Sequence, residues 1–150
     1  MRMEISKRSW KARTVYITKN LEKIYGHPLH GNKKNPTDEL FYIFLTKKSR
    51  PDIYKKIYRQ LKFICTPWDK VLELPESKLF EILRPLGFGK SRARELKKIS
   101  KKLKVDFGSV TLNPLKSITL NEAHRYLLSL PGIGEKYSRC VLMYSLGHDI

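Results

Sequence analysis

Two amphipathic stretches near the C-terminus stand only a few residues apart, and this spacing constrains the fold more than any other feature. Residues 119–130 open with the capping signature Thr119-Leu120-Asn121-Glu122, and residues 135–146 carry apolar side chains at helical intervals. Between them lies Pro131-Gly132-Ile133-Gly134, in which the proline ends the first helix and glycine permits a tight turn. The sequence therefore predicts two helices joined by a short hairpin.

Helical periodicity also runs through the rest of the chain, and no segment shows the alternation typical of a strand. The predicted helices include residues 36–45, which are apolar on nearly every face, residues 51–64, and the very basic residues 90–104. A chain of 150 residues is long enough for one ordinary domain with a buried core. We therefore predict an all-α fold, a compact multi-helix domain that spans residues 1–150.

The chain is strongly basic, with 31 Lys and Arg against 14 Asp and Glu and a formal net charge of +17. Such a field attracts polyanions, so nucleic acid is the expected partner, ahead of an acidic membrane surface or the ribosome. No apolar stretch is long enough to span a bilayer, and the N-terminal residues do not resemble a secretory signal. Cys65 and Cys140 are isolated, so we expect no disulfide framework and no metal site, and a reducing intracellular compartment.

The predicted hairpin has two interpretations, a plain turn between helices or a site for a phosphate. The first amides of a helix lack internal partners and lie at the positive end of its dipole, and a bare glycine lets an anion approach them. Lys136 follows directly behind the turn. Together with the net charge, this lysine favours phosphate binding, with Gly132, Ile133 and Gly134 as the predicted DNA-binding residues.

The segment "LPGIGEKYSRCVLMYSLG" resembles the helix-hairpin-helix of the endonuclease III-like DNA glycosylases, whose pattern is close to L-P-G-[VI]-G-x-K. The likeness extends to "NPTDELFYIFLTKKSRPDIYKKIYRQL", which is similar to the early core helices of that family. It also extends to "LPESKLFEILRPLGFGKSRARELKKISKKL", which is similar to the family's central segment. Together the three segments cover about Asn35 to Gly147 in the family's order.

This resemblance implies base excision repair, in which the N-glycosidic bond of a flipped damaged or mispaired base in double-stranded DNA is hydrolysed. Lys136 falls on the lysine nucleophile of the bifunctional members, whose amine forms a Schiff base with the sugar and gives AP-lyase activity. That role requires a lysine pKa lowered by burial or by neighbouring cations. Alternatively, Lys136 contacts a phosphate or is solvated, because monofunctional members have other residues there.

Two further groups are predicted to contact DNA. The turn Lys47, Lys48, Ser49 and Arg50 matches the place where relatives usually offer a glutamine to fill the gap left by the flipped base. Lys48 stands at that place, and basic residues occur there in relatives resembling thymine–guanine mismatch glycosylases, which suggests the mismatch-specific branch. Contacts to phosphates are an equally good explanation. Lys90, Ser91 and Arg92 are predicted to form a second backbone clamp, or a solvated face.

The chain also departs from the family pattern. The family's essential aspartate would fall beyond Ile150, and Asp149 comes several residues too early. The four iron–sulfur cysteines of many members are absent, so no cofactor is expected within this chain. We therefore expect a fragment, or a chain that a further C-terminal segment or a partner chain completes. A noncatalytic helix-hairpin-helix DNA-binding module is the main alternative function, and an RNA-binding protein is a third. The expected location is the cytoplasm (nucleoid) or another reducing compartment that contains DNA, with no membrane partner.

Overall fold

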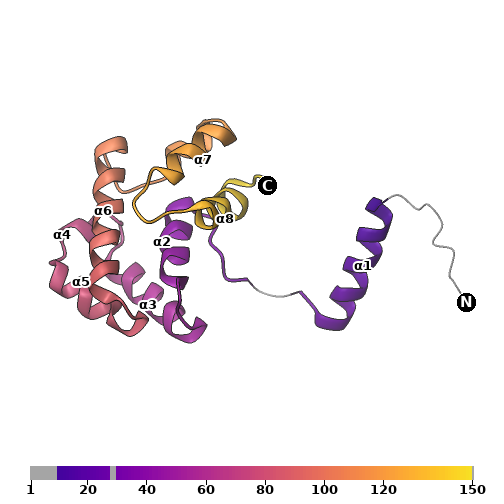
Figure 1. Cartoon of the computed structure of the whole chain (residues 1–150), viewed down its shortest axis with the longest axis horizontal. Coiled ribbons are helices and arrows are strands. Elements are labelled where there is room, and N and C mark those ends of the chain that lie inside the picture. Colours follow the sequence, from indigo (N-terminus) through magenta and orange to yellow (C-terminus); the bar gives the residue numbers. More distant parts are fainter. Residues whose placement is uncertain (1–9, 28–29, 150) are drawn as a thin grey trace, which may run out of the picture. The chain divides into compact units, whose positions relative to one another are not determined.

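The computed structural model describes residues 10–27 and 30–149, and every regular element within them is helical (Figure 1). In chain order the elements are α1 (Trp10–Tyr25), α2 (Pro36–Thr46), α3 (Pro51–Ile64), α4 (Lys70–Glu73), α5 (Glu76–Leu83), the 3-10 helix η1 (Arg84–Leu86), α6 (Gly89–Phe107), the 3-10 helix η2 (Asn113–Ser117), α7 (Leu120–Leu128) and α8 (Glu135–Leu146). The predicted all-α class is confirmed.

The chain divides into two compact units, Met1–Gly31 and Asn32–Ile150. In the first unit, α1 is amphipathic and buries none of its side chains. The second unit holds the remaining helices and the hydrophobic core. The expectation of one domain over residues 1–150 stays a prediction.

Helix α2 is the central element of the second unit. Asn35 caps it, because its side-chain oxygen accepts hydrogen bonds from the amides of Thr37 (2.9 Å) and Asp38 (3.1 Å). Pro36 occupies the first helical position, where its missing amide costs nothing. Nearly all of the following side chains are buried, and α3 and α8 both pack against this helix. The sequence correctly predicted its start, its cap and its central place.

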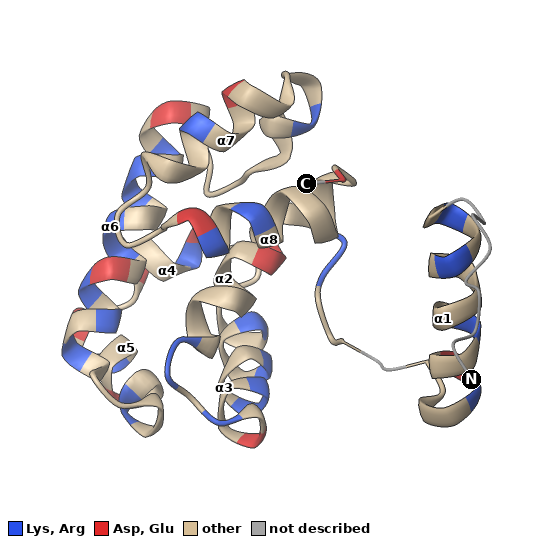
Figure 2. Cartoon of the chain, turned by 45° about the vertical axis from the view of Figure 1, so that its right-hand side comes forward, with Lys and Arg blue, Asp and Glu red and all other residues tan. Residues whose placement is uncertain are grey.

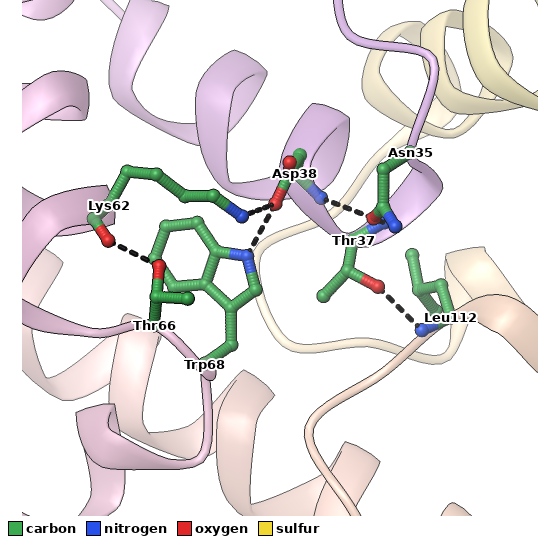
Figure 3. A network of polar contacts seen from close by, with 7 residues as sticks. All are labelled: Asn35, Thr37, Asp38, Lys62, Thr66, Trp68 and Leu112. Atoms are coloured by element: carbon green, nitrogen blue, oxygen red, sulfur yellow. Dashed lines mark hydrogen bonds and ion pairs between the residues drawn. The ribbon is translucent and has the colours of Figure 1, made fainter.

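Polar side chains in the first turn of α2 hold three distant segments (Figure 3). Asp38 accepts a hydrogen bond from Trp68 Nε1 (2.7 Å) and forms an ion pair with Lys62. Thr37 Oγ1 accepts a hydrogen bond from the amide of Leu112 (2.9 Å). These hydrogen bonds and this ion pair give partners to polar groups that the fold removes from water. They also fix the end of α3 and two loops on the core.

The later helices follow the predicted boundaries except at the end of α6. The capping box Thr119–Glu122 starts α7, and α8 spans Glu135–Leu146 as predicted. Helix α6 was expected to end at Lys104, but it continues for another turn. Its end is set by Gly108, which takes a left-handed conformation (φ 76°) that glycine adopts without strain.

Candidate nucleic-acid interface

The hairpin between α7 and α8 has the tight geometry that its sequence predicts. Gly132 takes φ 72°, a left-handed conformation that an L side chain would strain. The side chain of Ile133 is buried, and its amide donates to the carbonyl of Leu130 (3.2 Å). Ile133 therefore anchors the turn to the core, and only the flanking glycines face outward.

The start of α8 is open. Gly134 is the N-cap residue and offers no side chain to the first amides of the helix. Among the described residues, no protein acceptor is found for the amides of Gly134, Glu135 and Lys136. A Cβ built on Gly134 would meet nothing within 4 Å. Unpartnered amides at the positive end of a helix, with clear space in front of them, can receive an anion. The assignment of Gly132, Ile133 and Gly134 to DNA binding stays a prediction.

Glu135 ties the two helices of the hairpin together. Its Oε2 lies 3.1 Å from His124 Nε2 on α7 and 3.2 Å from Arg139 Nε one turn further along α8. Arg139 and then His124 hold the pKa of Glu135 below its usual range. No role was predicted for His124, since a lone histidine on a helix carries no spacing signal.

Lys136, the predicted nucleophile, is the second residue of α8 and is exposed. No ion pair or hydrogen bond of its side chain is found among the described residues. One turn further along, Cys140 is half-buried, and burial raises the pKa of its thiol, while the charge of Lys136 lowers it. The catalytic role of Lys136 stays a prediction.

A pocket of about 220 Å³ lies between the turn after α2 and the start of α6. It is lined by Phe44, Lys47, Lys48, Phe88, Ser91, Arg92 and Glu95. The structure thus brings together four of the predicted DNA-contacting residues from two distant segments. The three remaining predicted residues of these two segments lie outside the lining. Ser49 donates to the carbonyl of Leu86 (3.2 Å), Arg50 pairs with Asp52 (3.2 Å), and Lys90 lies over the ring of Phe80.

Two lining residues have an uncommon backbone conformation. Lys48 (φ 49°) and Phe88 (φ 53°) are the non-glycine residues with positive φ in the described part of the chain. Each such conformation costs on the order of 1–3 kcal/mol and is typical of ligand sites. Phe88 is 72% exposed, so burial of its ring does not compensate this strain. The sequence analysis missed Phe88, although an aromatic residue between two glycines was a usable signal.

Arg92 is one of the predicted DNA contacts. It is only 4% exposed, and its guanidinium donates to the carbonyls of Gly87 (2.9 Å), Phe44 (3.3 Å) and Lys47. It also donates to Ser49 Oγ (3.2 Å). Burial lowers its pKa. Arg92 therefore joins the two turns that frame the pocket. Its predicted contact with DNA stays a prediction.

Positive charge lies along α3 and α6 (Figure 2). Lys98, Lys101 and Lys102 of α6 line a second, shallow hollow next to Pro131, on the hairpin side of the helix. The basic residues therefore reach from the pocket to the hairpin. The described residues contain no group of three or more His, Cys, Asp or Glu that could hold a metal ion. None of their helices is long and apolar enough to cross a membrane.

Comparison with known proteins gives consistent relatives, although no family model matches the chain. A predicted DNA glycosylase of Arabidopsis thaliana is 27% identical over 112 residues, which cover 75% of this chain and 38% of that protein. Among solved structures, a thermostable thymine-DNA glycosylase has a TM-score of 0.73 at 20% identity and covers 91% of this chain. A trapped endonuclease III–DNA covalent intermediate has a TM-score of 0.68 at 18% identity, with the same coverage.

The chain spans 38% of the Arabidopsis relative and about three fifths of each of these two solved structures (60% and 61%). In sequence the chain is similar to a DNA glycosylase, and it has the fold of the solved thymine-DNA glycosylase and endonuclease III, as its three matching segments predicted.

Proposed function

We propose that this chain is the DNA-binding and base-excision core of a DNA glycosylase that acts on double-stranded DNA. The observation that carries the proposal is the position of Glu95. This residue lines the pocket, and its Oε2 lies 2.9 Å from the position that a Cβ of Gly132 would take. The pocket and the hairpin are therefore neighbours on one face, which is the arrangement needed to hold a strand and a disturbed base pair at once.

The hairpin supplies the sequence-independent part of the binding. Phosphate contacts through the open amides at Gly134 and Glu135 would position the strand without reading its bases. The exposed Lys48 and Phe88 at the pocket are the groups available to enter the base stack once a nucleotide has been flipped. A damaged or mispaired base flips at lower cost than a paired one, which gives selectivity for such bases. The basic turn at Lys48 supports mismatched U·G or T·G pairs as substrates.

Lys136 is the proposed nucleophile. Its amine attacks the sugar C1′, the new N–C1′ bond forms as the glycosidic bond breaks, and the base leaves with the bonding electrons. The sugar ring then opens: the C1′–O4′ bond breaks, O4′ takes the proton that the amine nitrogen loses, and C1′ and the lysine nitrogen form a Schiff base. Loss of a proton from C2′ next breaks the C3′–O bond and releases the 3′ phosphate by β-elimination, which is AP-lyase activity. The endonuclease III structure of the same fold was trapped as a covalent DNA intermediate, which supports testing this route.

Borohydride trapping tests the proposal directly. The protein is incubated with duplexes that contain an abasic site, an oxidised pyrimidine, or a U·G or T·G mismatch, and the adduct is measured on a denaturing gel. We expect a covalent adduct with at least one duplex, its loss in Lys136→Ala, and its retention in Lys116→Ala, a matched exposed lysine on η2. Absence of both adduct and base release on every duplex would refute catalysis.

A noncatalytic DNA-binding module is the second candidate. The exposure of Lys136, without a carboxylate partner among the described residues, favours it. This alternative predicts binding that is equally tight for damaged and undamaged duplexes and falls steeply with salt. Selective binding of an abasic duplex at constant salt would contradict it.

A further inference from the structure

The exposed side of α3 carries a row of cations that ends in an exposed aromatic ring. Lys55, Arg59 and Phe63 follow one another at intervals of four residues, which places them along one side of the helix. All three side chains are exposed, and Phe63 is 90% exposed. We propose that this row is a second nucleic-acid site and that it binds single-stranded DNA. The inference goes beyond the function proposed above, which uses the hairpin and the pocket.

The cations of this surface are available to phosphates. Among the described residues, no carboxylate forms an ion pair with Lys55, Lys56 or Arg59. Asp52, the acid in the first turn of α3, is already paired with Arg50 (3.2 Å). The exposed side of the helix therefore carries a net positive charge that the protein itself does not neutralise, and such a surface attracts a polyanion.

Phe63 favours a single strand over a duplex. In a duplex the faces of the bases are covered by their neighbours in the stack, so an exposed ring on a helix surface finds no base to stack on. An unpaired strand exposes those faces, and proteins that bind single strands combine a basic track with aromatic side chains. The row therefore fits a strand whose phosphates contact Lys55 and Arg59 and whose base stacks on Phe63.

A groove beside this row has room for a further base. It lies between α3 and α5, has a volume of about 520 Å³, and has an apolar lining that includes Ile57, Ile64 and Ile82. The exposed Lys56 and Gln60 also line it, and within the described part of the chain the Gln60 side chain forms no hydrogen bond. The volume falls within the roughly 300–1,000 Å³ of small-molecule sites. An unstacked base therefore finds an apolar surface and polar groups in the same groove.

This site is separate from the hairpin. Helix α2 packs against both α3 and α8 and lies between them (Figure 2). The buried side chains of α3 are Ile57, Tyr58 and Leu61, so the exposed row points away from the core. Helix α3, which is described in full, lends no residue to the pocket at Phe88 or to the hollow beside Pro131. The protein can therefore hold a single strand on α3 while a duplex occupies the hairpin.

Fluorescence anisotropy with a labelled oligothymidine of about twelve nucleotides tests the inference, because single-strand sites cover about 4–16 nucleotides. The titration is made in the presence of one equivalent of unlabelled duplex. We expect the oligothymidine to bind without being displaced. The double variant Lys55→Ala/Arg59→Ala should bind it more weakly and should reduce the slope of log K against log salt by about 1.4, at about 0.7 for each phosphate contact. Displacement by the duplex, or an unchanged slope in the double variant, would overturn the inference.

Further variants separate stacking from charge. Phe63→Ala should weaken binding of the oligothymidine about tenfold, the worth of about one stacked base. Phe63→Trp should keep the affinity, whereas Phe63→Leu, which is apolar but not aromatic, should lose it. The control Lys34→Ala/Lys116→Ala removes two exposed lysines outside α3 and should keep both the affinity and the slope. Equal affinities of the Trp and Leu variants would refute stacking on Phe63. Urea unfolding of each variant confirms that it is folded.

Two competitors identify the ligand. Polyglutamate, which has charge but no bases, should not displace the oligothymidine at equal charge, and equal displacement would assign the row to an acidic protein segment. An oligouridine of the same length that binds more tightly than the oligothymidine would assign it to RNA.

The same titrations show at which level a failure occurs. If duplexes bind but the oligothymidine does not, only the α3 site is wrong. If the oligothymidine binds through α3 and no duplex binds, the α3 site stands and the proposed function is wrong.

Discussion

The carboxylate of Glu95 lies against the backbone of Gly132, so that a methyl group on Gly132 would stand 2.9 Å from Glu95 Oε2. This contact joins α6 to the hairpin and makes the pocket and the open end of α8 parts of one surface. Gly132 is also held at φ 72°. Its lack of a side chain is therefore required twice, for the turn and for the approach of α6.

Gly132→Ala should lower the free energy of unfolding. A left-handed backbone alone costs an alanine about 1–2 kcal/mol. We expect a larger loss, because the added methyl group also displaces Glu95. Urea unfolding measures the change. Gly134→Ala is the matched control, because Gly134 has φ −107° and open space around its Cα. Similar losses in the two variants would contradict the distinct roles of these glycines.

Gly134→Ser should separate stability from binding. A serine at the N-cap can accept a hydrogen bond from the first turn of α8, which raises helix stability by a few tenths of a kcal/mol relative to glycine. The same side chain stands where a phosphate would approach. We therefore expect equal or greater stability and a several-fold weaker Kd for duplex DNA by anisotropy at fixed salt. An unchanged affinity for DNA would show that the DNA backbone does not bind at the start of α8.

Arg92→Met should destabilise the protein by about 2–4 kcal/mol, because it leaves buried carbonyl groups of both pocket turns without a donor. The exposed Arg94→Met, which removes only the ion pair with Glu76, should cost less than about 1 kcal/mol. Urea unfolding of both variants measures the difference. If the two losses are equal, Arg92 does not hold the turns.

Phe88→Ala should leave the unfolding free energy nearly unchanged and weaken binding to an abasic duplex by about tenfold, the loss of about one stacking contact. Binding to undamaged duplex, which depends on phosphates, should stay the same. Phe63→Ala is the matched control, since Phe63 is an exposed phenylalanine on α3 outside the pocket. Anisotropy with both duplexes measures the effect, and equal weakening on both would argue against insertion.

Asp69 should make stability depend on acid pH. Its carboxylate accepts from Lys104 Nζ (2.7 Å) and from the amide of Val110 (3.1 Å), and the bond from Lys104 is the largest cause of its lowered pKa. A carboxylate whose pKa is lower in the folded state stabilises the fold above its ordinary pKa of 3.8 and loses this effect as pH falls below that value.

Asp69→Asn removes that contribution. The gap in unfolding free energy between wild type and Asp69→Asn should therefore be largest near pH 7 and should shrink below about pH 4. Urea unfolding at pH 7, 5 and 3 measures it. A gap that widens on acidification would show that the lowered pKa is not the source of the stabilisation.

The sequence by itself determined the helices and the hairpin. Their signals are local: the cap at Asn35, the capping box at Thr119–Glu122, and proline and glycine between α7 and α8 act on residues a few positions away. Local backbone chemistry of this kind can be read without knowing the fold. The prediction was wrong at the end of α6, where Gly108 stops the helix one turn later than the apolar pattern suggested.

Only the tertiary structure decided which charged residues share a site. Arg92 and Ser91 are adjacent in the sequence, yet Arg92 is buried among carbonyl groups and Ser91 is exposed beside Glu95. Phe88 and Lys48, forty residues apart, meet at one pocket because Arg92 joins their turns. Such contacts depend on packing between distant segments. A sequence pattern shows the charge of a side chain, but it does not show which residue of another segment will contact that side chain.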